Sequence, residues 1–330
     1  AAAVAVVTSG TAVLLGDDTG TGRSVTMAPA TKDVTALPKK GVGPLTHAYI
    51  SRCSALGNLD GKCVPGQWRV VTESGTTYAL VDTMSPDRTD KALTSPVAIT
   101  KDGRRIAYYS ERKQTFEVRD LASGQTWKAP LKVRRGDFDG ESFLRLSPDG
   151  LQLLYTNWGG MPRPYSVLVD MAKGRTTTLN GAWYPVSVGD GGSPITLVKP
   201  YDKTSRVWVV GNRPTTVKDF TYSFSALGPD GHTIVRLGRN VDGQSRKIFV
   251  SDAVGGTEEP ALRVTGLPDG MTPAKLGDWV SETEVTMLAA SELHRSDVNS
   301  ALYAVDVRTG RARELRTFAD FPAALPGVVR

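Results

Sequence analysis

Aromatic and cationic side chains gather in four short polar segments of this sequence, at residues 157–165, 199–205, 238–246 and 290–300. Flat aromatic rings stack on peptides and sugars, and Arg and His side chains donate hydrogen bonds to ligand oxygens. The mixture therefore suits a peptide, a glycan or an anionic small molecule. The candidate ligand-binding residues are Trp158, Arg163, Tyr165, Tyr201, Arg239, His294 and Arg295. The alternative is that the aromatic rings pack in the core and the arginines are only solvated.

Groups for catalysis or metal binding are scarce. The 330 residues include three histidines and two cysteines. They contain no GxSxG, HExxH or GxxxxGK[ST] motif and no strand followed by GxGxxG. We therefore expect no catalytic residue, no metal and no cofactor, and we predict a binding protein. A propeller enzyme (lyase or hydrolase) or a lectin-like sugar-binding module is the alternative.

One acidic stretch, RRGDFDGES, resembles half of a calcium loop through Asp137, Asp139 and Glu141. Calcium requires several oxygen ligands within one turn. The sequence offers no further acidic position and no distal ligand, so we interpret the stretch as a solvated connection.

Net charge argues against nucleic acid as a partner. The 40 Lys and Arg residues exceed the 34 Asp and Glu residues by six, but the two signs are interleaved throughout. A dedicated nucleic-acid surface would concentrate its positive charge in runs or patches. A protein or peptide partner is expected instead, with a glycan as a second possibility.

The two cysteines predict export. Cys53 and Cys63 enclose the turn-forming segment SALGNLDGK, and no CxxC motif or second pair accompanies them. A disulfide-closed hairpin fits this spacing better than a metal or redox site. We therefore expect a secreted or otherwise extracytoplasmic protein.

The opening residues, AAAVAVVTSGTAVLLG, have two readings. They are either the remnant of a signal or membrane anchor, shorter than the ~20 residues that span a bilayer, or a pair of strands. In the second reading residues 23–28 and 33–37 supply two more strands. Residues 1–44 are accordingly a first blade, or an anchor remnant with a linker.

Internal repeats with a period of 40 to 50 residues organise the rest of the chain. Three copies contain a KDG or PDG turn, and their turn aspartates are 47 and 81 residues apart. A degenerate copy with Asp190-Gly191 fills the longer interval, and Ser281-Glu282 replaces the turn in another. The turn aspartates are Asp102, Asp149 and Asp230. We expect each to accept hydrogen bonds within its own turn.

Each copy reads as four short strands, with alternating apolar residues between Gly, Asp and Pro turns. A single small sheet cannot bury both faces, whereas sheets stacked radially can. The sequence therefore predicts an all-β fold, a β-propeller of four-stranded antiparallel blades over residues 45–330. Seven blades are favoured if the opening segment forms strands, and six are the alternative. In residues 45–94 the segment THAYISRC is taken as the first strand, with the cysteine hairpin after it.

Within these copies, SPDG at 147–150 and GPDG at 228–231, each followed by an apolar strand and a second Asp, resemble the TolB-like or PD40 (WD40-like) propeller repeat. The likeness extends over about residues 95–318. It implies a propeller of the kind common in secreted and periplasmic proteins. It implies no particular ligand, because such repeats serve binding scaffolds and enzymes alike.

Propeller geometry links this fold to the candidate residues. Loops between second and third strands emerge on one face of the ring, and the PDG turns emerge on the other. The four aromatic and cationic segments occupy the second-to-third position of their repeats. We therefore predict an exported scaffold that binds a protein, peptide or cell-envelope component on its loop-rich channel face, with membrane anchoring through a removed N-terminal segment as a further option.

Overall fold

The computed structural model describes most of the chain between residues 34 and 327. The described ranges are 34–51, 66–84, 95–138, 142–157, 165–179, 183–200, 204–218, 221, 223–238, 246–291, 300–319 and 321–327. They belong to one compact unit. Within these ranges there is no α-helix, and no helix is long and apolar enough to cross a membrane.

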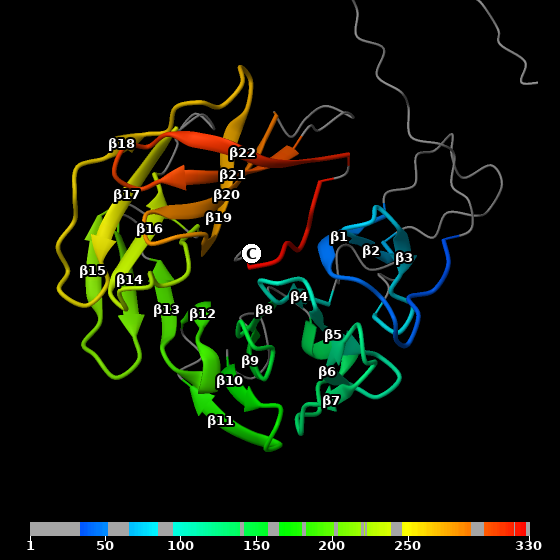
Figure 1. Ribbon diagram of the computed structural model, residues 1–330. Helices are drawn as coiled ribbons and strands as arrows, with labels where there is room; N and C mark the ends of the chain where they lie inside the picture. The colour runs from blue at the N-terminus through cyan, green and yellow to red at the C-terminus, as the bar shows by residue number, and fades with distance from the viewer. Residues whose placement is uncertain are drawn as a thin grey trace, which may run out of the picture. The chain divides into compact units, whose positions relative to one another are not determined.

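Six small antiparallel sheets follow one another around a centre in Figure 1, so the protein is a six-bladed β-propeller. The alternative of six blades predicted from the sequence is confirmed, and the favoured prediction of seven blades is wrong. Residues 35–37, part of the segment expected to form the last strand of an additional blade, instead lie parallel to a strand of the first blade through the bridge between Ala36 and Ala79.

Four of the blades, numbered 2, 3, 4 and 6, contain four named strands each in the expected order. Blade 2 comprises β4 (Val97–Ile99), β5 (Arg105–Ser110), β6 (Thr115–Asp120) and β7 (Thr126–Lys128). Blade 3 comprises β8 (Ser142–Leu146), β9 (Gln152–Asn157), β10 (Tyr165–Asp170) and β11 (Arg175–Leu179). Blade 4 comprises β12 (Tyr184–Val188), β13 (Ile195–Pro200), β14 (Thr204–Val209) and β15 (Thr215–Lys218). Blade 6 comprises β19 (Thr272–Trp279), β20 (Glu284–Ala290), β21 (Ser300–Asp306) and β22 (Ala312–Phe318).

Blades 1 and 5 each contain three named strands. Blade 5 comprises β16 (Thr233–Leu237), β17 (Lys247–Asp252) and β18 (Leu262–Arg263), and Phe224 bridges to Arg236 in the innermost position. Blade 1 comprises β1 (Leu45–Ile50), β2 (Trp68–Thr72) and β3 (Thr77–Ala79). Short 3-10 helices occur at Arg135–Phe138 and Asp190–Gly192.

The C-terminal segment supplies the innermost position of blade 1. Ala324 forms an antiparallel bridge with Ala48 of β1, and Pro326 forms a parallel bridge with Ile99 of β4. Figure 1 shows this segment, in red, running from the end of β22 toward the centre beside β1 and β4. THAYISRC is therefore the second strand of its blade and not the first, because the other end of the chain provides the inner strand that closes the ring.

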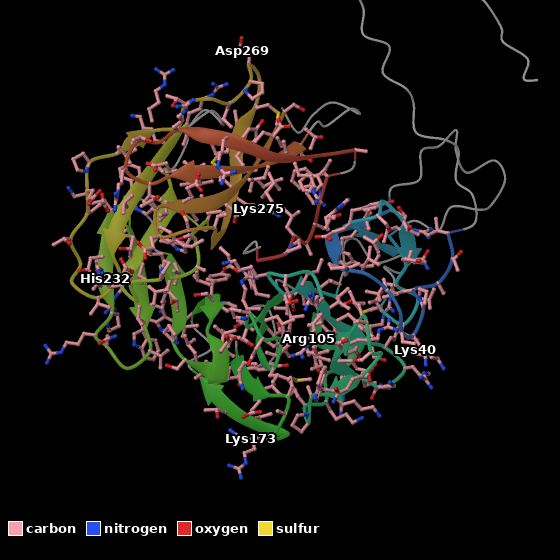
Figure 2. All side chains as sticks on the ribbon, viewed as in Figure 1. Lys40, Arg105, Lys173, His232, Asp269 and Lys275 are labelled. Atoms are coloured by element: carbon pink, nitrogen blue, oxygen red, sulfur yellow. The ribbon has the colours of Figure 1, made fainter. Side chains whose placement is uncertain are left out.

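Apolar side chains between neighbouring blades form the core. Between blades 2 and 3, the rings of Phe116 and Tyr155 are centred 4.6 Å apart, and Phe138 lies 4.6 Å from Tyr109. Every tryptophan in the described part belongs to or packs on such a cluster. Arg105, labelled in Figure 2, stacks 4.9 Å from the ring centre of Trp127 in its own blade and joins the same two blades by donating to the carbonyl of Asp149.

Candidate functional site

The four segments singled out in the sequence do connect second and third strands. They join β9 to β10, β13 to β14, β16 to β17 and β20 to β21. Because the C-terminal segment is the inner strand of blade 1, the connection from β1 to β2 is a second-to-third connection as well. Cys53 and Cys63 belong to that connection, but both lie outside the described residues, so their disulfide stays a prediction.

Of the seven candidate ligand-binding residues, the structure describes Tyr165. Its half-buried ring lies 5.8 Å from that of Tyr155 in an edge-on contact, and burial raises the pKa of its hydroxyl. Tyr165 thus packs at the edge of the core between blades 2 and 3. The other six lie outside the described residues, and their grouping on one face stays a prediction: Trp158, Arg163, Tyr201, Arg239, His294 and Arg295.

The acidic stretch is described only in part. Asp137 lies in the 3-10 helix Arg135–Phe138, and its Oδ2 accepts a hydrogen bond of 2.6 Å from the amide of Arg134. Asp139 and Glu141 lie outside the described residues. Among the residues that the structure does describe, no three His, Cys, Asp or Glu side chains converge as a metal site.

The turn aspartates have the local role that the sequence predicts. Oδ1 of Asp149 accepts hydrogen bonds from the Ser147 hydroxyl at 2.5 Å and the Leu151 amide at 2.9 Å. Asp230 accepts from two amides and a hydroxyl of its own turn, and Asp102 from one of each. These carboxylates hold their turns and do not converge on a ligand.

A cavity of about 440 Å³ lies in the channel, at the end where the first strands turn into the second strands. Its walls combine inner-strand residues with the PDG-type turns, including Pro148, Gly228 and Ser281. This end is opposite to the loop-rich face on which the sequence places the ligand. Every blade contributes an apolar residue to the wall, namely Leu325, Ile99, Leu144, Val186, Leu227 and Trp279.

Three charged side chains from three blades interact electrostatically at this cavity, and Glu282, in the turn after β19, also lines it. Asp278 comes from β19, Lys101 from the turn after β4, and Arg145 from β8. Burial raises the pKa of Asp278 to about 6, although the positive charges of Lys101 and Arg145 both act to lower it. Among the described residues, no hydrogen bond or ion pair reaches the Asp278 carboxylate.

The two cations are held by backbone carbonyls. Lys101 Nζ donates to the carbonyl oxygen of Trp279 at 2.7 Å, which links blade 2 to blade 6. Arg145 is buried and donates from Nε to the Val186 carbonyl at 3.1 Å and from Nη1 to the Leu144 carbonyl at 2.8 Å. The arrangement offers a carboxylate and an ammonium group inside an apolar wall.

The backbone at Gly327 packs closely against the Asp278 carboxylate. Gly327 has a φ of +61°, and a Cβ there would lie 2.4 Å from Oδ2 of Asp278. The sequence-based reasoning missed all three charged residues. The available signal for Arg145 and Asp278 was a charge among the apolar residues of an inner strand, as in SFLRL and LGDW. Only the ring brings these residues together.

No family model matches this chain, and no curated protein matches its sequence. Solved structures match in fold. TolB from Acinetobacter baumannii is 16% identical, with a TM-score of 0.48 over 79% of this chain and 61% of that one. Kuenenia stuttgartiensis hydrazine synthase is 12% identical, with a TM-score of 0.47 over 73% and 69%. An oligogalacturonate lyase in complex with manganese is 12% identical, with a TM-score of 0.44 over 84% and 74%. The chain is thus similar in structure to TolB and other propellers, and this similarity assigns no function.

Proposed function

We propose that this protein is an exported binding scaffold that recognises a protein, peptide or cell-envelope component on the loop-rich face of its ring. The supporting observation is topological. The connections that join second to third strands all leave from one end of the blades, and they differ widely in length. The turns between first and second strands, at the opposite end, are short, and those of blades 2, 3 and 5 are held by their own aspartates.

A scaffold with this construction separates stability from recognition. The blades bury the apolar faces and carry the fold, so the long connections are free to carry aromatic and cationic contacts. Trp158 and Arg163 lie in one such connection, and large aromatic and Arg side chains dominate the binding energy of most protein interfaces. The Cys53–Cys63 pair lies in another and supports the assignment to an oxidising compartment.

The experiment compares capture of envelope components by immobilised wild-type protein and by the Trp158→Ala/Arg163→Ala variant. The variant is expected to lose about 1 to 3 kcal/mol of partner binding while keeping its melting temperature. Lys173→Ala is the matched control, because Lys173, labelled in Figure 2, is exposed in the turn between β10 and β11 at the opposite end. Equal capture by wild type and the double variant would reject the loop-rich face as the recognition surface.

A further inference from the structure

The channel cavity is accessible to solvent from the turn side of the ring. Lys101, Val280 and Glu282 line it and are exposed, and Val280 keeps 42% of its surface in solvent. A volume of about 440 Å³ falls within the range of small-molecule sites. The cavity lies at the other end of the blades from the loop-rich face, so an occupant would not depend on those loops.

The wall would desolvate an apolar body. Aliphatic side chains and one indole come from all six blades, and the inner positions among them are nearly inaccessible: Leu144 is 3% exposed and Val186 3%. Entry into such a cavity removes the occupant's own apolar surface from water, which is worth about 25 cal/mol per Å². The apolar part of an occupant therefore needs no particular orientation, and the charged groups must set it.

Of the four charged residues that line the cavity, Asp278 and Lys101 present one acceptor and one donor side by side. Asp278 offers carboxylate oxygens that no described residue engages. Lys101 uses one described hydrogen bond, to Trp279, of the three that an ammonium group donates. Both groups lie close together on the wall, because Lys101 is hydrogen-bonded to the carbonyl of Trp279, the residue that follows Asp278.

We infer that this cavity is a second binding site, and that it takes a small zwitterion with an apolar body, an apolar dipeptide or amino acid. The ligand ammonium group would lie against Asp278, its carboxylate against Lys101, and its side chains against the aliphatic wall. A plain cation would be repelled by Lys101 and Arg145, and a plain anion would be repelled by Asp278 and Glu282. A zwitterion pairs with both signs of charge and leaves the net charge of the cavity unchanged.

The stability of the fold does not explain why an aspartate occupies position 278. Its ionised carboxylate is partly desolvated in a cavity, where a neutral side chain of the same shape would be less costly. Residues that lower stability in a concave site are those expected to act on a ligand. Asp278→Asn should therefore stabilise the protein and weaken ligand binding. Substitution of a residue with a purely structural role would not have both effects.

The test is titration calorimetry with leucyl-leucine, its N-acetyl derivative and its C-terminal amide. The parent dipeptide is expected to bind, and loss of either charge should weaken binding about tenfold or more, because a charge-assisted hydrogen bond is removed. Asp278→Asn should weaken leucyl-leucine about tenfold or more but should not weaken the N-acetyl form, because that anion no longer faces the Asp278 charge. Lys101→Met should likewise weaken leucyl-leucine but should not weaken the C-terminal amide. Asp269→Asn, on an exposed turn labelled in Figure 2, is the control.

Three results would overturn the inference. They are no heat with leucyl-leucine, equal affinity for the parent and either blocked form, or unchanged binding in Asp278→Asn. The blocked dipeptides test the wild-type protein directly, so the outcome does not depend on any variant folding. A Trp158→Ala/Arg163→Ala protein should still bind leucyl-leucine, which separates this site from the proposed recognition face.

Discussion

Replacing Asp278 by Asn is expected to stabilise the protein at neutral and alkaline pH. The substitution keeps the shape of the side chain and removes its titration. Burial in the channel cavity raises the pKa of Asp278 to about 6 from its ordinary 3.8, despite the nearby charges of Lys101 and Arg145. The ionised carboxylate therefore lowers the stability of the folded state.

The magnitude follows from that pKa. One pKa unit corresponds to about 1.4 kcal/mol, so the difference between 3.8 and about 6 sets an upper limit of about 3 kcal/mol. Water in the cavity reduces this cost, and Asn also leaves the two cations without a nearby negative charge. We expect a gain of about 1 to 3 kcal/mol at pH 8.

The pH dependence carries the sharper test. The folded protein binds this proton more tightly than the unfolded chain, so the Asp278 contribution to stability falls as pH rises from about 4 to about 6. It stays low above that range. The variant lacks this titration. Its advantage over wild type should therefore be full at pH 8, largely developed at pH 6, about half developed near pH 5, and small at pH 4.

Urea unfolding of both proteins at pH 8, 6 and 4.5 measures the difference, with Asp269→Asn as the control for removing one exposed carboxylate. The difference between the two proteins isolates Asp278 from every other titrating group. A variant that is less stable than wild type at pH 8, or a difference that is constant with pH, would refute the reasoning. The carboxylate would then be held by favourable contacts.

Four further predictions concern other parts of the molecule. Burial lowers the pKa of His47 to about 4, with a smaller effect from Arg316, so its contribution to stability is present above pH 6.5 and lost as pH falls toward 4. In urea unfolding, His47→Asn should therefore lose less stability than wild type between pH 6.5 and 4. Gly103→Ala should cost about 3 kcal/mol and Gly75→Ala about 1 kcal/mol in the same measurement. Both have positive φ, but a Cβ at 103 would lie 2.4 Å from the Leu45 carbonyl oxygen, whereas nothing lies within 4 Å of one at 75. Asp149→Ala should lower the unfolding free energy by about 1 to 3 kcal/mol, and the more exposed Asp230→Ala by about 1 kcal/mol, with partner binding unchanged; loss of binding without loss of melting temperature would assign the turns to the recognition face. Thiol titration of the denatured, unreduced protein should find no free thiol, and two free thiols in exported protein would reject the Cys53–Cys63 disulfide.

Local pattern was enough to predict the repeating blade. Alternating apolar residues, Gly and Asp turns and the spacing of Asp102, Asp149 and Asp230 indicate strands and turns whose hydrogen bonds are made within a few residues. The structure confirms the turn contacts and the second-to-third position of the four candidate loops. Such features depend on short-range geometry, which the order of residues encodes directly.

Ring closure and the channel were decided by the tertiary structure. Ala48 pairs with Ala324 from the far end of the chain, and no local pattern shows that a C-terminal segment completes the blade whose other strands begin at Leu45. The shift from first to second strand in that blade follows from this single pairing, and the count of six follows from the number of sheets. Likewise Lys101, Arg145 and Asp278 each look like an isolated charge beside an apolar strand. They share a cavity only because stacking the blades around a centre brings inner strands from different repeats together.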